Sequence, residues 1–170
     1  MKYRRAVTVV LFVMAALALQ TTLFARLRPF EAAPALGVLA VIALSRHLTP
    51  EAALVTGFLT GFFQDLLADS ILGLWALSLS VAAFVTVRVR DRLLEDVTLV
   101  GPAVFALSLG ALALFAVLST IFGQKTLADA GLVRKMLLPA AYNLLLGILV
   151  LPIASRLLES QRRRAGGWQL

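Results

Sequence analysis

The chain has 170 residues, of which 61% are hydrophobic and 15% are charged, and its mean hydropathy is +0.94. Soluble domains of this length contain closer to ~45–50% apolar and ~25% charged residues, so the composition excludes an ordinary soluble protein. The apolar residues form long blocks, and each crossing of a bilayer core needs about 20 of them. Six crossings would use nearly the whole chain. The sequence therefore predicts one all-α membrane domain at residues 1–158, with six transmembrane helices, and a basic, mobile cytoplasmic tail at residues 159–170.

The first three apolar blocks run from Ala6 to Phe24, from Pro34 to Ser45, and from Ala52 to Leu67. The first block is longer than the ~7–15 apolar residues of a signal peptide, and further spans follow it, so we expect it to persist as a helix. The second block is short for a span. We expect it to be tilted, re-entrant or extended by its flanking residues.

The last three apolar blocks run from Ile71 to Val87, from Val97 to Phe122, and from Met136 to Leu158. Only three residues separate the fourth block from the third, so these two are predicted to form an antiparallel helical hairpin. Pro102 and Pro139 lie near the starts of the fifth and sixth blocks, where a proline disturbs a helix least.

Basic residues predict how the six helices are oriented. Cytoplasmic loops of membrane proteins carry an excess of Lys and Arg, and a cytoplasmic N-terminus places 11 of the 16 basic residues on that side. Both termini are therefore predicted to be cytoplasmic. The cytoplasmic group is Lys2, Arg4, Arg5, Arg46, Arg88, Arg90, Arg92, Arg156, Arg162, Arg163 and Arg164. The external group is Arg26, Arg28, Lys125, Arg134 and Lys135.

A stripe of small and acidic residues marks the third block. Gly57, Gly61, Asp65 and Asp69 recur every four residues, which places them on one face of a helix. The glycines allow close approach of another helix, and Asp65 lies near the external end of the block. Two interpretations stay open for Asp65: a buried helix-packing or partner-binding group, or a carboxylate at the wet end of the helix that caps or stabilises a loop. For Asp69 the second is favoured.

Polar and small residues elsewhere are expected to serve packing. Asn143 lies inside the last block with Gly147 one turn later, so we expect Asn143 to hydrogen-bond across to another helix or to line a site. Ala106 and Gly110 form a second small-residue pair and are expected to serve helix packing. Trp75 is expected at the membrane interface, in an aromatic belt.

The residue inventory argues against catalysis. The chain has no cysteine, and its single histidine, His47, is predicted on the opposite side of the membrane from Asp65. No phosphate-binding loop, metal-ligand motif or nucleophile–base set is present in the sequence. The basic residues are scattered among loops and do not form one nucleic-acid-binding face. We predict no enzyme activity, no cofactor, no metal and no nucleic-acid partner.

Several of these residues resemble a known family. The segment from Gly57 to Asp65 (GFLTGFFQD), followed by residues 73–77 (GLWAL), resembles the central signature of MreD, the bacterial rod shape-determining membrane proteins. Residues 20–23 (QTTL), Pro34, and the Tyr-Asn pair at 142–143 agree with it. The resemblance covers almost the whole chain and rests on the order and spacing of these marks.

The resemblance implies a role in the cell-elongation machinery of the bacterial inner membrane. Proteins of this family are non-enzymatic subunits that act with MreC, MreB, RodA and a class B penicillin-binding protein, and they help to regulate peptidoglycan synthesis and cell shape. Their six-helix fold resembles the substrate-binding subunits of energy-coupling-factor transporters. The alternative function is therefore a vitamin-binding subunit of such a transporter, although polar residues in the external half are few. The matching positions are Pro34, Gly61, Asp65, Gly73 and Asn143.

Overall fold

The computed structural model describes residues 2–26, 33–68, 70–95 and 97–166, and over these residues the chain is helical and contains no strand. All six predicted blocks are helices, which confirms the all-α class. The helices are α1 (Lys2–Arg26), α2 (Leu36–Ser45), α3 (Pro50–Leu67), α4 (Leu74–Glu95), a 3-10 turn η2 (Val97–Leu99), α5 (Val100–Ile121) and α6 (Leu132–Gly166).

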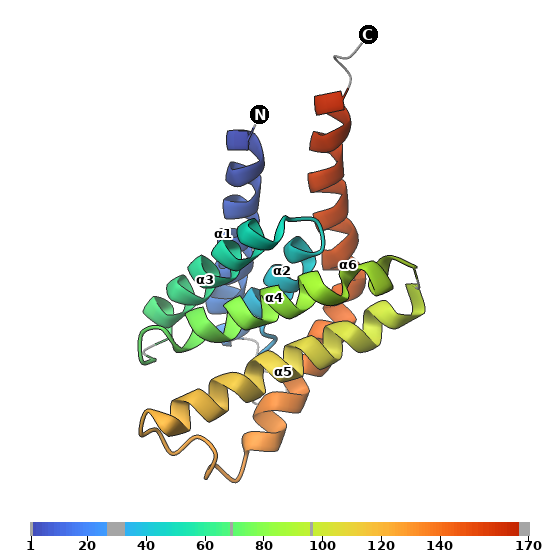
Figure 1. Ribbon diagram of the computed structural model, residues 1–170. Coiled ribbons are helices and arrows are strands. Elements are labelled where there is room, and N and C mark those ends of the chain that lie inside the picture. Colours follow the sequence, from blue (N-terminus) through green and yellow to red (C-terminus); the bar gives the residue numbers. More distant parts are fainter. Residues whose placement is uncertain (1, 27–32, 69, 96, 167–170) are drawn as a thin grey trace.

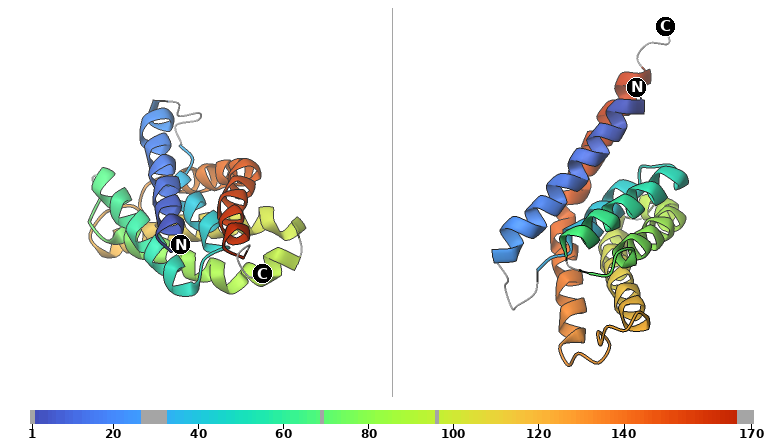
Figure 2. Two further views of the ribbon diagram at one scale, coloured as in Figure 1. Left: turned by 90° about the horizontal axis from the view of Figure 1, so that it is seen from above. Right: turned by 90° about the vertical axis from the view of Figure 1, so that its left-hand side faces the viewer.

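The first and last helices, α1 and α6, place the two ends of the chain at the same end of the bundle. The N-terminal end of α1 and the C-terminal end of α6 lie together, and the loop between α5 and α6 lies at the opposite end (Figure 1). Helices α3 and α4 form the predicted antiparallel hairpin and run obliquely to α1 (Figures 1 and 2).

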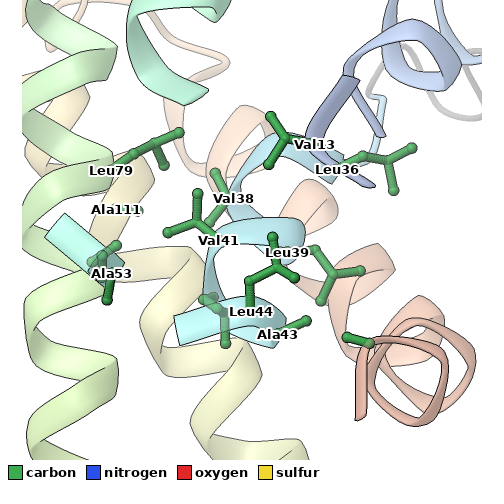
Figure 3. Packing of buried hydrophobic residues seen from close by; sticks show 14 of the residues in the cluster. Val13, Leu36, Val38, Leu39, Val41, Ala43, Leu44, Ala53, Leu79 and Ala111 are labelled. Carbon is green, nitrogen blue, oxygen red and sulfur yellow. The ribbon is translucent and has the colours of Figure 1, made fainter. Parts of the chain in front are cut away.

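The short helix α2 forms the centre of the bundle. Its 10 residues are all buried, and it contacts each of the other five α-helices. Figure 3 shows its Val38, Leu39, Val41 and Leu44 side chains among residues of the surrounding helices. At ~1.5 Å per residue the helix is only about 15 Å long, half of a bilayer core. It ends at Ser45 in a turn, so the predicted extension is absent on that side; residues 27–32 of its other flank lie outside the described part.

Three segments are long and apolar enough to cross a membrane: Tyr3–Phe24 in α1, Val100–Ile121 in α5 and Leu132–Leu158 in α6. Their outer faces carry large apolar side chains, such as Ile121 and Ile148, which are 71% and 73% exposed. Apolar surface of this extent is unusual on a soluble protein and typical of a lipid-facing one. The protein is therefore a membrane protein.

Helix α6 is longer than predicted at both ends. It starts at Leu132 and continues past Leu158 to Gly166, so the segment predicted as a mobile tail is helical over most of its length. Residues 167–170 and the side chains of the arginine cluster at 162–164 lie outside the described part of the structure.

Candidate functional site at the α3–α4 seam

Two glycines of α3 lie directly against the backbone of α4. A Cβ atom added at Gly57 would lie 2.5 Å from the carbonyl oxygen of Leu79, and one added at Gly61 would lie 2.2 Å from that of Trp75. Real Cβ atoms do not approach oxygen so closely, so only glycine fits both positions without moving a helix. We call this contact, with Asp65 one turn further along α3, the α3–α4 seam.

Asp65 ends the seam as a buried carboxylate that is 2% exposed. Its oxygens accept four hydrogen bonds: from Ser70 Oγ at 2.7 Å and from the backbone N–H groups of Gly73, Trp75 and Ala76 at 2.9, 3.1 and 3.2 Å. An ionised carboxylate has only acceptors, which suits four donors.

The three N–H groups belong to the first turn of α4 and the residue before it. Helix α4 begins at Leu74, and the first N–H groups of a helix have no partner within that helix. The carboxylate therefore caps α4 from another helix, and its negative charge also lies at the positive end of the α4 dipole. Asp65 is thus a buried carboxylate that lies in a helix contact and caps α4, and its binding of a partner stays a prediction.

Gly73 has the backbone conformation that this cap requires. Its φ angle is +99°, in a region that residues with a Cβ rarely adopt. A Cβ added there would meet no atom within 4 Å, so the constraint is the backbone conformation and not space. Asp69, which the sequence placed on the same stripe, lies outside the described residues.

The Trp75 side chain is buried inside the bundle, so it does not face outward as the predicted aromatic belt requires. Its side chain is 9% exposed and stacks on Phe115 of α5, with the ring centres 4.1 Å apart. Its backbone packs against Gly61 at the same time. Trp75 thus joins the seam to α5.

A second polar cluster lies around Asn143 of α6, which is 0% exposed. Its Nδ2 donates to the carbonyl oxygen of Ala35 at 3.0 Å and to Ser108 Oγ at 3.1 Å, which connects α6 to α5 and to the start of α2. Gly147, one turn later, is in ordinary contact with its neighbours: a Cβ there would lie 3.4 Å from the Leu151 side chain.

Two glutamines also reach the start of α2, which the sequence analysis did not anticipate. Gln20 Oε1 accepts a hydrogen bond from the Gly37 N–H at 2.9 Å, so the end of α1 caps α2. Gln64, beside Asp65 on α3, is buried with its Oε1 over Gly37. Each glutamine lies near the end of an apolar block, and both belong to segments that resemble MreD, residues 20–23 and 57–65.

Ala106 and Gly110 do not pack against the other described helices, so their predicted packing role is not met within this chain. Both lie on an exposed face of α5, and a Cβ added at Gly110 would meet no atom within 4 Å. This small-residue pair therefore faces away from the other helices described.

The seam brings together hydrogen-bond donors around one carboxylate and no set of metal ligands. In the described part of the chain, no group of three or more His, Cys, Asp or Glu residues is placed to hold a metal. His47 lies 3.1 Å from Ser155 Oγ through its Nε2, far from Asp65 along the bundle. The chemistry that the Asp65 geometry supports is the fixing of one helix against another.

Comparison with protein families identifies the chain. The family described as rod shape-determining protein MreD matches residues 2–160. The chain belongs to the MreD family. Its role is therefore in rod shape determination, and MreD proteins are shape-determining membrane proteins that are not known as an enzyme family. Comparison with curated proteins and with solved structures gave no match.

The positions that carried the MreD resemblance fall into two places in the structure. Gly61, Asp65 and Gly73 meet at the α3–α4 seam. Asn143 lies in the second cluster, and the buried Pro34 directly precedes its hydrogen-bond partner Ala35. The MreD marks are therefore packing and capping positions, on both sides of the central helix α2.

Proposed function

We propose that this MreD protein is a non-enzymatic, multi-pass subunit of the rod complex in the bacterial inner membrane, which binds MreC and helps to regulate peptidoglycan synthesis. The observation that carries the proposal is the family match over residues 2–160. RodA, a class B penicillin-binding protein and MreB are proposed as further direct or indirect partners, together with membrane lipids. The rigid α3–α4 seam supports a scaffold role, because a binding surface built on fixed helices keeps its shape.

We also propose that all six α-helices belong to the membrane domain, with α3 and α4 crossing beside the three long apolar segments. Gln64 and Asp65 in the last part of α3 are buried, whereas outward residues such as Phe58 and Leu66 are 51% and 56% exposed. The outer face of α4 is likewise apolar, with Leu77 at 51% exposed. Polar groups directed inward and apolar groups directed outward are the arrangement that a bilayer requires.

Both termini are proposed to be cytoplasmic. The ends of α1 and α6 lie together in the structure, which supports a common side (Figure 2). That side is assigned to the cytoplasm because it carries the excess of Lys and Arg. Arg28, a member of the external group, lies outside the described residues. A single domain with a fold like that of energy-coupling-factor substrate-binding subunits also stays a prediction.

The alternative, a vitamin-binding transporter subunit, is not favoured by the family assignment. The Asp65 carboxylate accepts four hydrogen bonds and the Asn143 amide nitrogen donates two, whereas Asn143 Oδ1 and Gln64 Oε1 are buried without a partner among the described residues. The Asp65 carboxylate already bonds within the chain, so it is poorly placed to hold a polar ligand.

A co-purification experiment tests the proposal. The tagged full chain is purified in mild detergent from its own host, and partners are identified by mass spectrometry. We expect MreC with wall-synthesis proteins. Asp65→Leu should lose MreC and rod shape because it leaves the α4 cap unsatisfied, whereas Glu51→Leu, which removes an exposed carboxylate from the other end of α3, should keep both. Recovery of a transporter ATPase module in place of MreC would contradict the proposal.

A further inference from the structure

An open apolar groove runs between α1 and α3. It has a volume of about 590 Å³ and is lined by side chains of both helices, among them Val9, Val13 and Met14 of α1 and Val55, Leu59 and Phe63 of α3. This volume is within the ~300–1,000 Å³ of small-molecule sites. Arg5 near the start of α1, together with Leu48 and Thr49 just before α3, lines one end of the groove.

Arg5 has donor capacity that the protein does not use. Its Nη2 donates to the carbonyl oxygen of His47, but its Nε is buried and has no hydrogen-bond partner among the described residues. A buried N–H on a charged group without an acceptor is costly, so an acceptor from outside the chain is expected there.

A second arginine with a buried, unpaired Nε among the described residues is Arg46, two residues before Leu48, which lines the groove. It precedes His47 and is half-buried. Burial of this guanidinium lowers the pKa of Arg46 from its ordinary value. Arg90 reaches the same loop, donating from Nη1 to the Leu48 carbonyl oxygen at 2.8 Å. Arg5 and Arg90 therefore both donate to carbonyl oxygens of the turn between α2 and α3 to which Arg46 belongs.

Among the described residues, Arg90 has an ion-pair partner and Arg5 and Arg46 have none. Arg90 is 3.5 Å from its neighbour Asp91. Glu51, the carboxylate that lines the groove, is exposed, and no ion pair joins it to Arg5 or Arg46 in the residues that the structure describes. The end of the groove thus combines excess positive charge with an apolar trough that leads away from it.

We propose that this groove binds one phospholipid with an anionic headgroup, with the phosphate at Arg5 and Arg46 and an acyl chain along the apolar faces of α1 and α3. Basic pockets between membrane helices on the cytoplasmic side bind acidic headgroups in this way. The arginines supply positive charge for the anionic headgroup. The apolar trough matches an acyl chain, which a free phosphate ion lacks. The inference does not depend on MreC binding.

Lipid retention by the purified full chain tests the charge. Native mass spectrometry of the protein incubated with phosphatidylglycerol or phosphatidylcholine should show preferential retention of phosphatidylglycerol. Arg5→Gln and Arg46→Gln should each reduce that retention about fivefold. Arg156→Gln, which removes an exposed charge from α6, is the matched control and should leave it unchanged. Equal retention of both lipids, or full retention by both groove variants, would overturn the proposal.

A second pair of variants tests the trough. Val55→Trp fills the groove from a position that is 57% exposed and should lower phosphatidylglycerol retention, whereas Val81→Trp on the outer face of α4, at 40% exposed, should not. Inorganic phosphate should not displace the lipid. A photo-crosslinker at Val10 in native membranes should give a lipid-sized adduct; a protein-sized adduct would assign the groove to a partner helix and overturn the lipid proposal.

Discussion

The carboxylate of Asp65, near the end of α3, accepts a hydrogen bond of 3.1 Å from the backbone N–H of Trp75 in the first turn of α4. The two residues are ten positions apart in the chain, so the end of one helix determines where the next one begins. Capping of this kind normally comes from the residue just before a helix. Here it comes from a neighbouring helix, so the cap and the packing of α3 on α4 depend on each other.

Replacing Asp65 by Asn should destabilise the protein. The amide has one acceptor oxygen, and its NH₂ group would face N–H donors that the carboxylate now satisfies. We expect a loss of about 1–3 kcal/mol in the free energy of unfolding, measured by reversible unfolding of the full chain in mixed micelles. Ser70→Ala, which removes only one of the four donors, should cost less. Equal losses for the two variants would contradict the cap.

Replacing Gly61 by Ala should force α3 and α4 apart, because the new Cβ would meet the α4 backbone. Overpacking of this kind costs about 1–3 kcal/mol. Gly110→Ala is the matched control on the exposed face of α5, and it should leave the midpoint of thermal unfolding unchanged or raise it, since Ala is the better helix former. A stable Gly61→Ala protein would contradict the direct contact.

Asn143 and Ser108 should be energetically coupled through their 3.1 Å hydrogen bond. Asn143→Leu should lower the free energy of unfolding by about 0.6–2 kcal/mol, the range for interhelical hydrogen bonds in membranes. A double-mutant cycle with Ser108→Ala isolates the pair. If the two single effects simply add, the hydrogen bond contributes nothing to stability.

Acidic pH should loosen the loop between α5 and α6. The hydrogen bond from Lys135, followed by that from the Gly131 N–H, lowers the pKa of Asp129 below its ordinary value of 3.8. A carboxyl whose pKa is lowered on folding stabilises the fold above its unfolded pKa, and this contribution is lost as the pH falls through the folded pKa. Titration of the Asp129 carboxyl by NMR should give a pKa below 3.8, and Lys135→Gln should raise it. An unchanged pKa in that variant would contradict the pairing.

The sequence was sufficient to predict the helices and the hairpin of α3 and α4, because long apolar blocks and a very short loop are strong local signals. The spacing of Gly57, Gly61 and Asp65 also indicated a close contact on one face. It did not reveal that the partner is the α4 backbone, since glycine spacing shows which face is smooth and not what lies against it.

It was harder to predict which face of each apolar helix is buried and which faces outward, as Trp75 and Gly110 show. In water, a polar face shows which side of a helix is exposed. In a bilayer both the protein interior and the lipid are apolar, so this contrast disappears. Trp75 therefore looked like an interface residue although it is buried, and the pair of Ala106 and Gly110 looked like a packing seam although it faces outward.

The shortness of α2 has a consequence for how the protein is made. A helix of 10 residues is too short to be released into the bilayer as an independent span during synthesis. Its position depends on contacts with all five other α-helices, of which α5 and α6 leave the ribosome last. Insertion of the N-terminal half should therefore remain provisional until α6 is complete, and a chain truncated before α5 should be recognised and degraded by membrane quality control.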